Sequence, residues 1–277
     1  MIPIFLINLD TSQDRLAAFH KMTRQLGLPF EKVSAVDSNK ITEDEKKLLF
    51  SYRSGYLPLG QGEMACFLSH RKVWELIVDR GIDWAFVAED DIHLENTSQF
   101  FKDSTWIPAD ADIVKAETAR QRVVLSPKLS STIDKHQMRQ LLSYHGGSAG
   151  YFVSNQTARF LLRETETKCD ALDHVLFHQW IGIVQKLKIY QLDPAICVQD
   201  YLALGGMKKN FISTLTADRS RSRSSQRLIA KPVGIAKVWR EISRPFKRSA
   251  QRLIDAFRNA TGQAVIKRIH YIGDNKP

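Results

Sequence analysis

The run DWAFVAEDDI, residues 83–92, is the most informative part of the sequence for the fold of this chain. Its aromatic residues, Trp84 and Phe86, suit a pleated surface packed on both faces, so the run predicts a buried strand. Three acids, residues 89–91, follow at once. In an open α/β sheet, ligands bind at the carboxyl ends of such strands. Adjacent carboxylates there repel one another, and Mg²⁺ or Mn²⁺ relieves that repulsion and brings phosphate groups with it. The alternative is a solvated acidic turn.

Strands and helices alternate on both sides of this run. The patterns predict strands at residues 2–9, 30–36, 111–115, 122–125, 151–153 and 188–192, and helices at 13–26, 63–80, 155–165 and 170–180. Residues 128–140 are polar and are expected to form a surface loop. This alternation predicts an α/β fold with a mixed sheet between helical layers.

Composition and cysteine usage favour a globular protein of the cytosol. The chain has 277 residues, of which 43% are hydrophobic, and no apolar run approaches the ~20 residues that span a bilayer. Residues 2–7 are apolar without a basic leader, so we expect a first strand and not a signal peptide. The three cysteines, Cys66, Cys169 and Cys197, are far apart, as is typical of reduced thiols. Cys66 precedes His70 by four residues, but no further ligand follows at the spacing of a zinc site.

The positive charge of the chain is concentrated at one end. Residues 219–277 hold 15 Lys and Arg against 3 Asp and Glu, whereas residues 1–218 hold 25 against 27. The net charge of +10 therefore belongs to a tail, and the body is nearly neutral. We expect a catalytic domain over 1–218 and a basic appendage over 219–277 with an anionic partner.

The appendage begins with the linker RSRSRSS, residues 219–225, and continues with apolar residues at three- and four-residue steps up to Ala260. Basic residues occupy the other faces, and Pro245 divides the pattern into two helices. Basic amphipathic helices of this kind bind anionic membrane surfaces. The alternatives are packing on the catalytic domain or on a second subunit, which would make an oligomer. Nucleic-acid binding is not expected, because no recognised binding motif accompanies the charge.

Four motifs, in their order and spacing, resemble glycosyltransferase family 25, the family of bacterial lipooligosaccharide galactosyltransferases, which is similar to collagen galactosyltransferases. They are INLD at residues 7–10 with Arg15, GEMACFLSH at 62–70 with Trp74, EDD at 89–91, and GSAGY at 147–151. The resemblance covers about residues 1–200. It implies a GT-A-like, Rossmann-type fold and inverting transfer from a UDP-sugar, most often UDP-galactose, to a lipid-linked glycan. With the reduced cysteines and the basic appendage, such an acceptor leads us to expect a cytoplasmic enzyme, peripheral on the inner face of the cytoplasmic membrane.

The resemblance makes the acid run the equivalent of the family's metal-binding motif. Asp91 is the first choice as ligand of Mn²⁺ or Mg²⁺, and Glu89 and Asp90 would contact the metal, its water or the ribose. Asn8 and Asp10, at the end of the first strand, are expected near the base or ribose.

Each of four further residues has two possible roles, one in ligand binding and one in the structure. Arg15 pairs with the diphosphate or forms a salt bridge with Asp10 or Asp14. His70 hydrogen-bonds the diphosphate or sugar, or is a structural helix residue. Glu63 is a site carboxylate or a charge favoured at a helix N-terminus. Gly150 gives close approach to the acceptor, or belongs to a turn before a strand.

An inverting transfer needs a general base for the acceptor hydroxyl. Asp170, Asp173 and Asp193 are the candidates, and Asp173 best matches the family's late acidic position; its alternative role is a helix N-terminal acid. A nucleotidyltransferase is the nearest enzymatic rival. It would be expected to show a glycine-rich, basic phosphate loop after the first strand, and residues 10–14, DTSQD, are not one.

Overall fold

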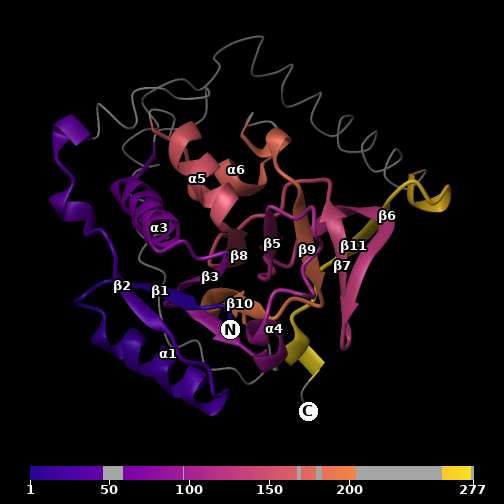
Figure 1. The fold of residues 1–277 in the computed structure, drawn as a ribbon, viewed down its shortest axis with the longest axis horizontal. Coiled ribbons are helices and arrows are strands. Elements are labelled where there is room, and N and C mark those ends of the chain that lie inside the picture. Colours follow the sequence, from indigo (N-terminus) through magenta and orange to yellow (C-terminus); the bar gives the residue numbers. More distant parts are fainter. Residues whose placement is uncertain (46–58, 96, 167–169, 179–182, 204–257, 276–277) are drawn as a thin grey trace, which may run out of the picture.

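The computed structural model describes residues 1–45, 59–95, 97–166, 170–178, 183–203 and 258–275. Nine strands form one mixed sheet in the order β11-β6-β7-β9-β5-β8-β3-β1-β2 (Figure 1). The pairs β1–β2, β1–β3 and β5–β9 are parallel, and the others are antiparallel. The strands are β1 Ile4–Asn8, β2 Glu31–Ser34, β3 Trp84–Glu89, β5 Ile113–Lys115, β6 Arg122–Ile133, β7 His136–Leu141, β8 Gly150–Ser154, β9 Ile189–Asp193 and β11 Val265–Arg268.

Helices cover both faces of the sheet. On one face lie α3 (Gln61–Asp79), α5 (Asn155–Glu164) and α6 (Leu172–Phe177), and on the other lie α1 (Gln13–Gln25) and α4 (Ser98–Lys102) (Figure 1). The alternation along each strand explains why two cores form. Phe5 of β1 packs in the core under α3, and its neighbour Leu6 packs with Phe19 of α1 in the other. The predicted α/β class, with a mixed sheet flanked by helices, is confirmed.

The stretch expected as a surface loop, residues 128–140, is instead a β-hairpin. β6 and β7 pair antiparallel, with Ile133 opposite His136, and Asp134 takes a positive φ of 50° at the turn. Met138 and Leu141 are buried, while the residues around them are polar. A hairpin with one face exposed to solvent needs few apolar residues. The polar composition of residues 128–140 therefore did not indicate strands.

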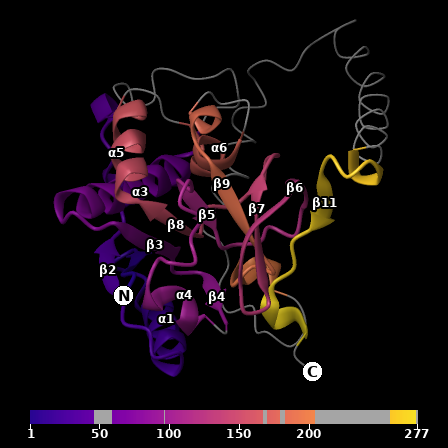
Figure 2. The same ribbon diagram turned by 45° about the vertical axis from the view of Figure 1, so that its right-hand side comes forward.

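The end of the chain returns to the sheet. β11 pairs antiparallel with β6, and Figure 2 shows it along that strand's outer edge. Arg120 holds Asp274 through two hydrogen bonds of 2.6 and 2.7 Å, and Tyr271 is buried. These residues of the expected appendage therefore belong to the main domain, because their apolar side chains complete its core.

The expected linker and most of the expected amphipathic helices fall within residues 204–257, outside the described residues. Residues 258–260, at the end of the second one, are helical. Within the described parts of the chain, every helix is too short or too polar to span a membrane.

A two-stranded ribbon stands beside the main sheet and positions the residues after β3. β4 (Ile92–Leu94) pairs antiparallel with β10 (Cys197–Gln199), which places Gln199 opposite Ile92. The amide of Asp200 donates a 2.7 Å hydrogen bond to the carbonyl of Asp91. The chain therefore turns at Asp91 and is held there from the other side by β10.

Candidate active site

A pocket of about 650 Å³ opens at the carboxyl ends of β1 and β3. Its wall is made of four segments: the end of β1 with the loop into α1, the loop after β2 at residues 35–39, the first three turns of α3, and residues 89–91. In the parallel pairing of β1 with β3, Ile7 lies opposite Glu89, so the next residues, Asn8 and Asp90, also adjoin. The pocket is therefore a consequence of strand register.

Asp90 is held by two side chains from the first strand and helix. Its Oδ1 accepts a 3.0 Å hydrogen bond from Arg15 Nη1, and its Oδ2 accepts one of 2.8 Å from Asn8 Nδ2. The side chains of Arg15 and Asp90 are only 13% and 12% exposed, so this ion pair is well shielded from solvent. Arg15 thus pairs with Asp90 and not with Asp10 or Asp14, and it places a positive charge on the wall of an acidic pocket.

Asp91 is a buried carboxyl group beside two others. Burial, followed by the negative charges of Glu89 and Asp90, raises its pKa from 3.8 to about 7. The amide of Gln199 lies at 3.4 and 3.5 Å from the two carboxylate oxygens and opposes this rise. The charged form of Asp91 is therefore destabilised in the protein, and a cation in the pocket would stabilise it.

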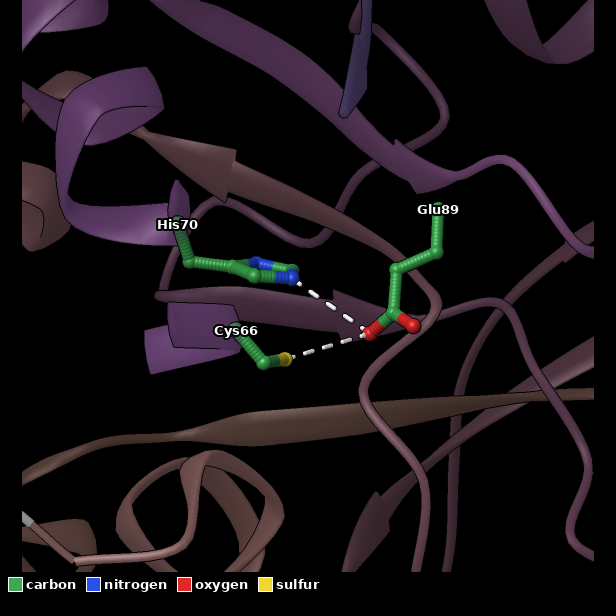
Figure 3. A group of neighbouring side chains, drawn as sticks. All are labelled: Cys66, His70 and Glu89. Atoms are coloured by element: carbon green, nitrogen blue, oxygen red, sulfur yellow. Dashed lines mark hydrogen bonds and ion pairs between the residues drawn. The ribbon is translucent and has the colours of Figure 1, made fainter. Parts of the chain in front are cut away.

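Glu89 faces two side chains of α3 (Figure 3). Its Oε1 lies 3.4 Å from Nε2 of His70 and accepts a 3.8 Å hydrogen bond from the thiol of Cys66. Burial lowers the pKa of His70 to about 3, against the opposing charge of Glu117. The imidazole is therefore neutral at physiological pH, and its contact with Glu89 is not an ion pair.

A second polar cluster, buried next to the pocket, surrounds the loop before β8. Lys115 donates to the carbonyl of Gly147, and its Nζ lies 3.4 Å from Glu117, which accepts a 2.9 Å hydrogen bond from the amide of Ala149. Burial lowers the pKa of Lys115 and raises that of Glu117. Gly147 has a φ of 83°, and a Cβ there would collide with the Glu117 carboxylate, so only glycine fits.

Asp173 of α6 borders this second cluster. Its Oδ2 accepts a 2.6 Å hydrogen bond from the hydroxyl of Tyr144 and a longer one, 3.4 Å, from the amide of Gly147. Asp173 is partly exposed but is not among the residues that line the pocket.

The other predicted site residues fall into two groups, those at the pocket and those away from it. Arg15, His70, Glu89, Asp90 and Asp91 all line the pocket, and Asn8 lies behind Asp90.

Asp10, Glu63 and Gly150 do not line it. Asp10 is exposed and pairs with Lys32 and Ser34. The carboxylate of Glu63 accepts a 2.9 Å hydrogen bond from the amide of Gly60, which is the helix-terminus role. Gly150 is a strand residue, where any side chain would collide with the sulfur of Cys197.

Sequence reasoning missed Glu117 and Gln199 and did not join Cys66 to the site. Glu117 follows a predicted strand by two residues, a position where a carboxylate signals function. For Gln199 and for the meeting of Cys66 with Glu89 no local signal exists, because the partners come from different elements.

Replacing the buried charge at Asp91 tests these electrostatics. We expect Asp91→Asn to stabilise the metal-free protein at about pH 8 by on the order of 1–4 kcal/mol, since a pKa unit corresponds to about 1.4 kcal/mol. An acid with a raised folded-state pKa destabilises the fold fully above that pKa, and the destabilisation is lost as the pH falls to the unfolded-state pKa. The gain should therefore vanish as the pH falls from about 7 to about 4. Urea denaturation in chelator at both ends of this range measures it. Asp110→Asn, at an exposed carboxylate paired with Lys188, is the control that should give no gain. Destabilisation by Asp91→Asn at pH 8 would contradict the account.

Comparison with known proteins gives the family. The profile of glycosyltransferase family 25 (LPS biosynthesis protein) matches residues 1–176. The chain is 27% identical over 258 residues to the lacto-N-neotetraose biosynthesis glycosyltransferase LgtE of Neisseria gonorrhoeae, covering 89% of this chain and 92% of that protein. It is 28% identical to LgtB of the same organism, covering 80% and 83%, and 24% identical to the lipooligosaccharide biosynthesis protein lex-1 of Haemophilus influenzae, covering 76% and 72%. The resemblance drawn from the motifs is confirmed, and the protein belongs to glycosyltransferase family 25.

Proposed function

We propose that this protein transfers a hexose, galactose first among the donors, from a UDP-sugar to a lipooligosaccharide-type glycan with inversion at the anomeric carbon. The observation that carries the proposal is the convergence of three carboxylates, Arg15 and a neutral imidazole in one pocket at the carboxyl end of β3. The names of the relatives, which concern lacto-N-neotetraose and lipooligosaccharide biosynthesis, support the acceptor class.

A divalent cation, Mn²⁺ or Mg²⁺, fits the pocket by its donor chemistry. Asp91 and Glu89 supply the hard oxygen ligands, and the raised pKa of Asp91 marks charge that the protein alone leaves uncompensated. When bound, the cation stabilises charge on the departing diphosphate. Both carboxylate oxygens of Asp90 accept hydrogen bonds from the protein, so we assign Asp90 to holding Arg15 and not to the metal.

The nucleotide would extend from this point along the β1 side of the pocket. Arg15 meets the diphosphate, and residues 35–39 line the wall beyond it. Asn8 donates to Asp90 and so acts through that residue, whereas Asp10 lies at the exposed end of the same loop. His70, neutral and buried, hydrogen-bonds the sugar or diphosphate without adding charge.

We assign the general base to Asp173. Its carboxylate is oriented by hydrogen bonds from the Tyr144 hydroxyl and the Gly147 amide. It therefore borders the cluster that contains Glu117. An acceptor entering over this loop would meet a carboxylate that remains partly exposed and ready to take the hydroxyl proton.

We also propose that the part of the basic tail outside the main domain, residues 219–257, binds the anionic inner face of the cytoplasmic membrane and so holds the enzyme near a lipid-linked acceptor. These residues hold 11 Lys and Arg against 2 Asp and Glu, a balance of +9, and this charge supports the proposal, since juxtamembrane basic residues contribute about 1 kcal/mol each. Self-association through the same residues is the competing outcome.

A UDP-release assay over UDP-galactose, UDP-glucose and their N-acetyl derivatives, with a lipooligosaccharide acceptor, tests the reaction. We expect UDP-galactose to be preferred and chelator to abolish turnover. Asp91→Asn should lower kcat by on the order of 10²- to 10³-fold, while Asp110→Asn should leave it unchanged. Turnover that survives both chelator and Asp91→Asn would overturn the metal assignment.

The same assay separates the base from the donor site. Asp173→Asn should lower transfer by on the order of 10²- to 10⁴-fold and leave UDP binding intact. Normal transfer by this variant would remove Asp173 from the mechanism.

Co-sedimentation of the full chain with vesicles tests the tail. We expect binding to phosphatidylglycerol vesicles that weakens with salt, and none to phosphatidylcholine. Binding should fall by on the order of 10²- to 10³-fold when four tail residues become Gln: Arg240, Arg244, Lys247 and Arg248. The matched control neutralises four exposed basic residues of the body: Lys21, Arg24, Lys102 and Lys128. Equal loss in both variants, or no binding by the wild type, would sink the membrane proposal.

A further inference from the structure

Three side chains of different chemistry meet at one side of the pocket (Figure 3). Cys66 and His70 lie one turn apart on α3 and therefore project from the same face of the helix. Glu89 reaches them from the end of β3. The Sγ, imidazole nitrogen and carboxylate oxygen of these residues all lie within 4.8 Å of one another.

The imidazole of His70 is fixed with one nitrogen turned toward this cluster. Its Nδ1 lies 2.9 Å from the hydroxyl of Tyr151, whose ring stacks on it at 5.8 Å and 13°. The same hydroxyl accepts a 2.9 Å hydrogen bond from the indole of Trp74, and all three side chains are fully buried. The other nitrogen, Nε2, is buried and has no hydrogen-bond partner among the described residues. An unsatisfied buried nitrogen beside a thiol and a carboxylate calls for an explanation.

Two of the three separations between these atoms are close to those of a tetrahedral metal site, and the third is no more than 4.8 Å. With Zn–S bonds of ~2.3 Å and Zn–N or Zn–O bonds of ~2.0–2.1 Å, ligand atoms around zinc lie roughly 3.3–3.6 Å apart. Here Nε2 and Oε1 are separated by 3.4 Å and Sγ and Oε1 by 3.8 Å. Side-chain shifts of roughly 1 Å or less would therefore complete three bonds.

We propose that Cys66, His70 and Glu89 bind a zinc-class divalent cation whose fourth position opens to the pocket. A thiolate and an imidazole favour Zn²⁺ or Co²⁺, whereas the all-carboxylate arrangement around Asp91 favours Mn²⁺ or Mg²⁺. Three protein ligands with an open fourth position are the pattern of a zinc site that can take water or a substrate oxygen. Tyr151 orients the imidazole, as an outer partner does for most metal-bound histidines. This site goes beyond the proposed transfer reaction and does not depend on it. It uses Glu89 and the same Nε2 of His70, so while zinc is bound these two side chains are withdrawn from the roles proposed for them in the transfer reaction.

Titration of the metal-free full-length protein with Co²⁺ tests the site directly. We expect one equivalent to produce a thiolate-to-cobalt charge-transfer band and the strong visible bands of tetrahedral Co²⁺, and Zn²⁺ to displace both. Cys66→Ser should lose the charge-transfer band. Two controls should keep it: Cys197→Ala, at a buried thiol outside the cluster, and Asp91→Asn, which removes a carboxylate of the hard-cation site.

The absence of the band in the wild type, or its persistence in Cys66→Ser, would overturn the proposal. Loss of the band in Asp91→Asn would show that the cation sits among the carboxylates instead. Alkylation of the wild-type protein gives a test that needs no variant to fold: Zn²⁺ should slow the modification of Cys66 at least about tenfold. Unchanged alkylation would also contradict the site. Transfer activity with Mn²⁺ is measured separately, so failure of the zinc site leaves the proposed function standing.

Discussion

The structure of the pocket depends on the negative charge gathered where β3 ends. Asp91 is buried beside Glu89 and Asp90, and its raised pKa shows that the protein does not fully compensate the charge. Neighbouring elements compensate part of this negative charge. β1 and α1 bring Asn8 and Arg15 to Asp90, and β10 brings an amide to Asp91. The remaining negative charge is the basis of our proposal that a cation binds here together with an anionic ligand such as a diphosphate.

Glu89 stands between two sets of donors with different preferences. On the Asp91 side its neighbours are carboxylates, and on the α3 side they are a thiol and an imidazole. Hard and thiophilic cations would therefore compete for one carboxylate. Zn²⁺ in the second set would then draw Glu89 away from the first, which couples the two sites through a single side chain. The neutral His70 keeps the pocket from gaining a second fixed positive charge beside Arg15.

Much of this fold was predictable, because strand and helix periods are local. The apolar run before Glu89 and the helix after Gly60 are both where the sequence placed them. The hairpin at residues 122–141 was not predictable from its polar pattern, and neither was the return of β11, since both depend on partners elsewhere in the sheet. The same holds for the site. The acid run could be predicted from the sequence, whereas the contact between Cys66 and Glu89 depends on the tertiary structure.

We propose that the carboxylates at the end of β3 and a nucleotide diphosphate share a cation. Isothermal titration calorimetry of UDP binding to the metal-free protein, with and without Mn²⁺, tests this most directly. If they share it, Mn²⁺ should raise the affinity for UDP by about 5- to 150-fold, the usual range of coupling between linked sites, and the gain should disappear when Asp91 is replaced by Asn. Equal UDP affinity in the presence and absence of Mn²⁺ would contradict it.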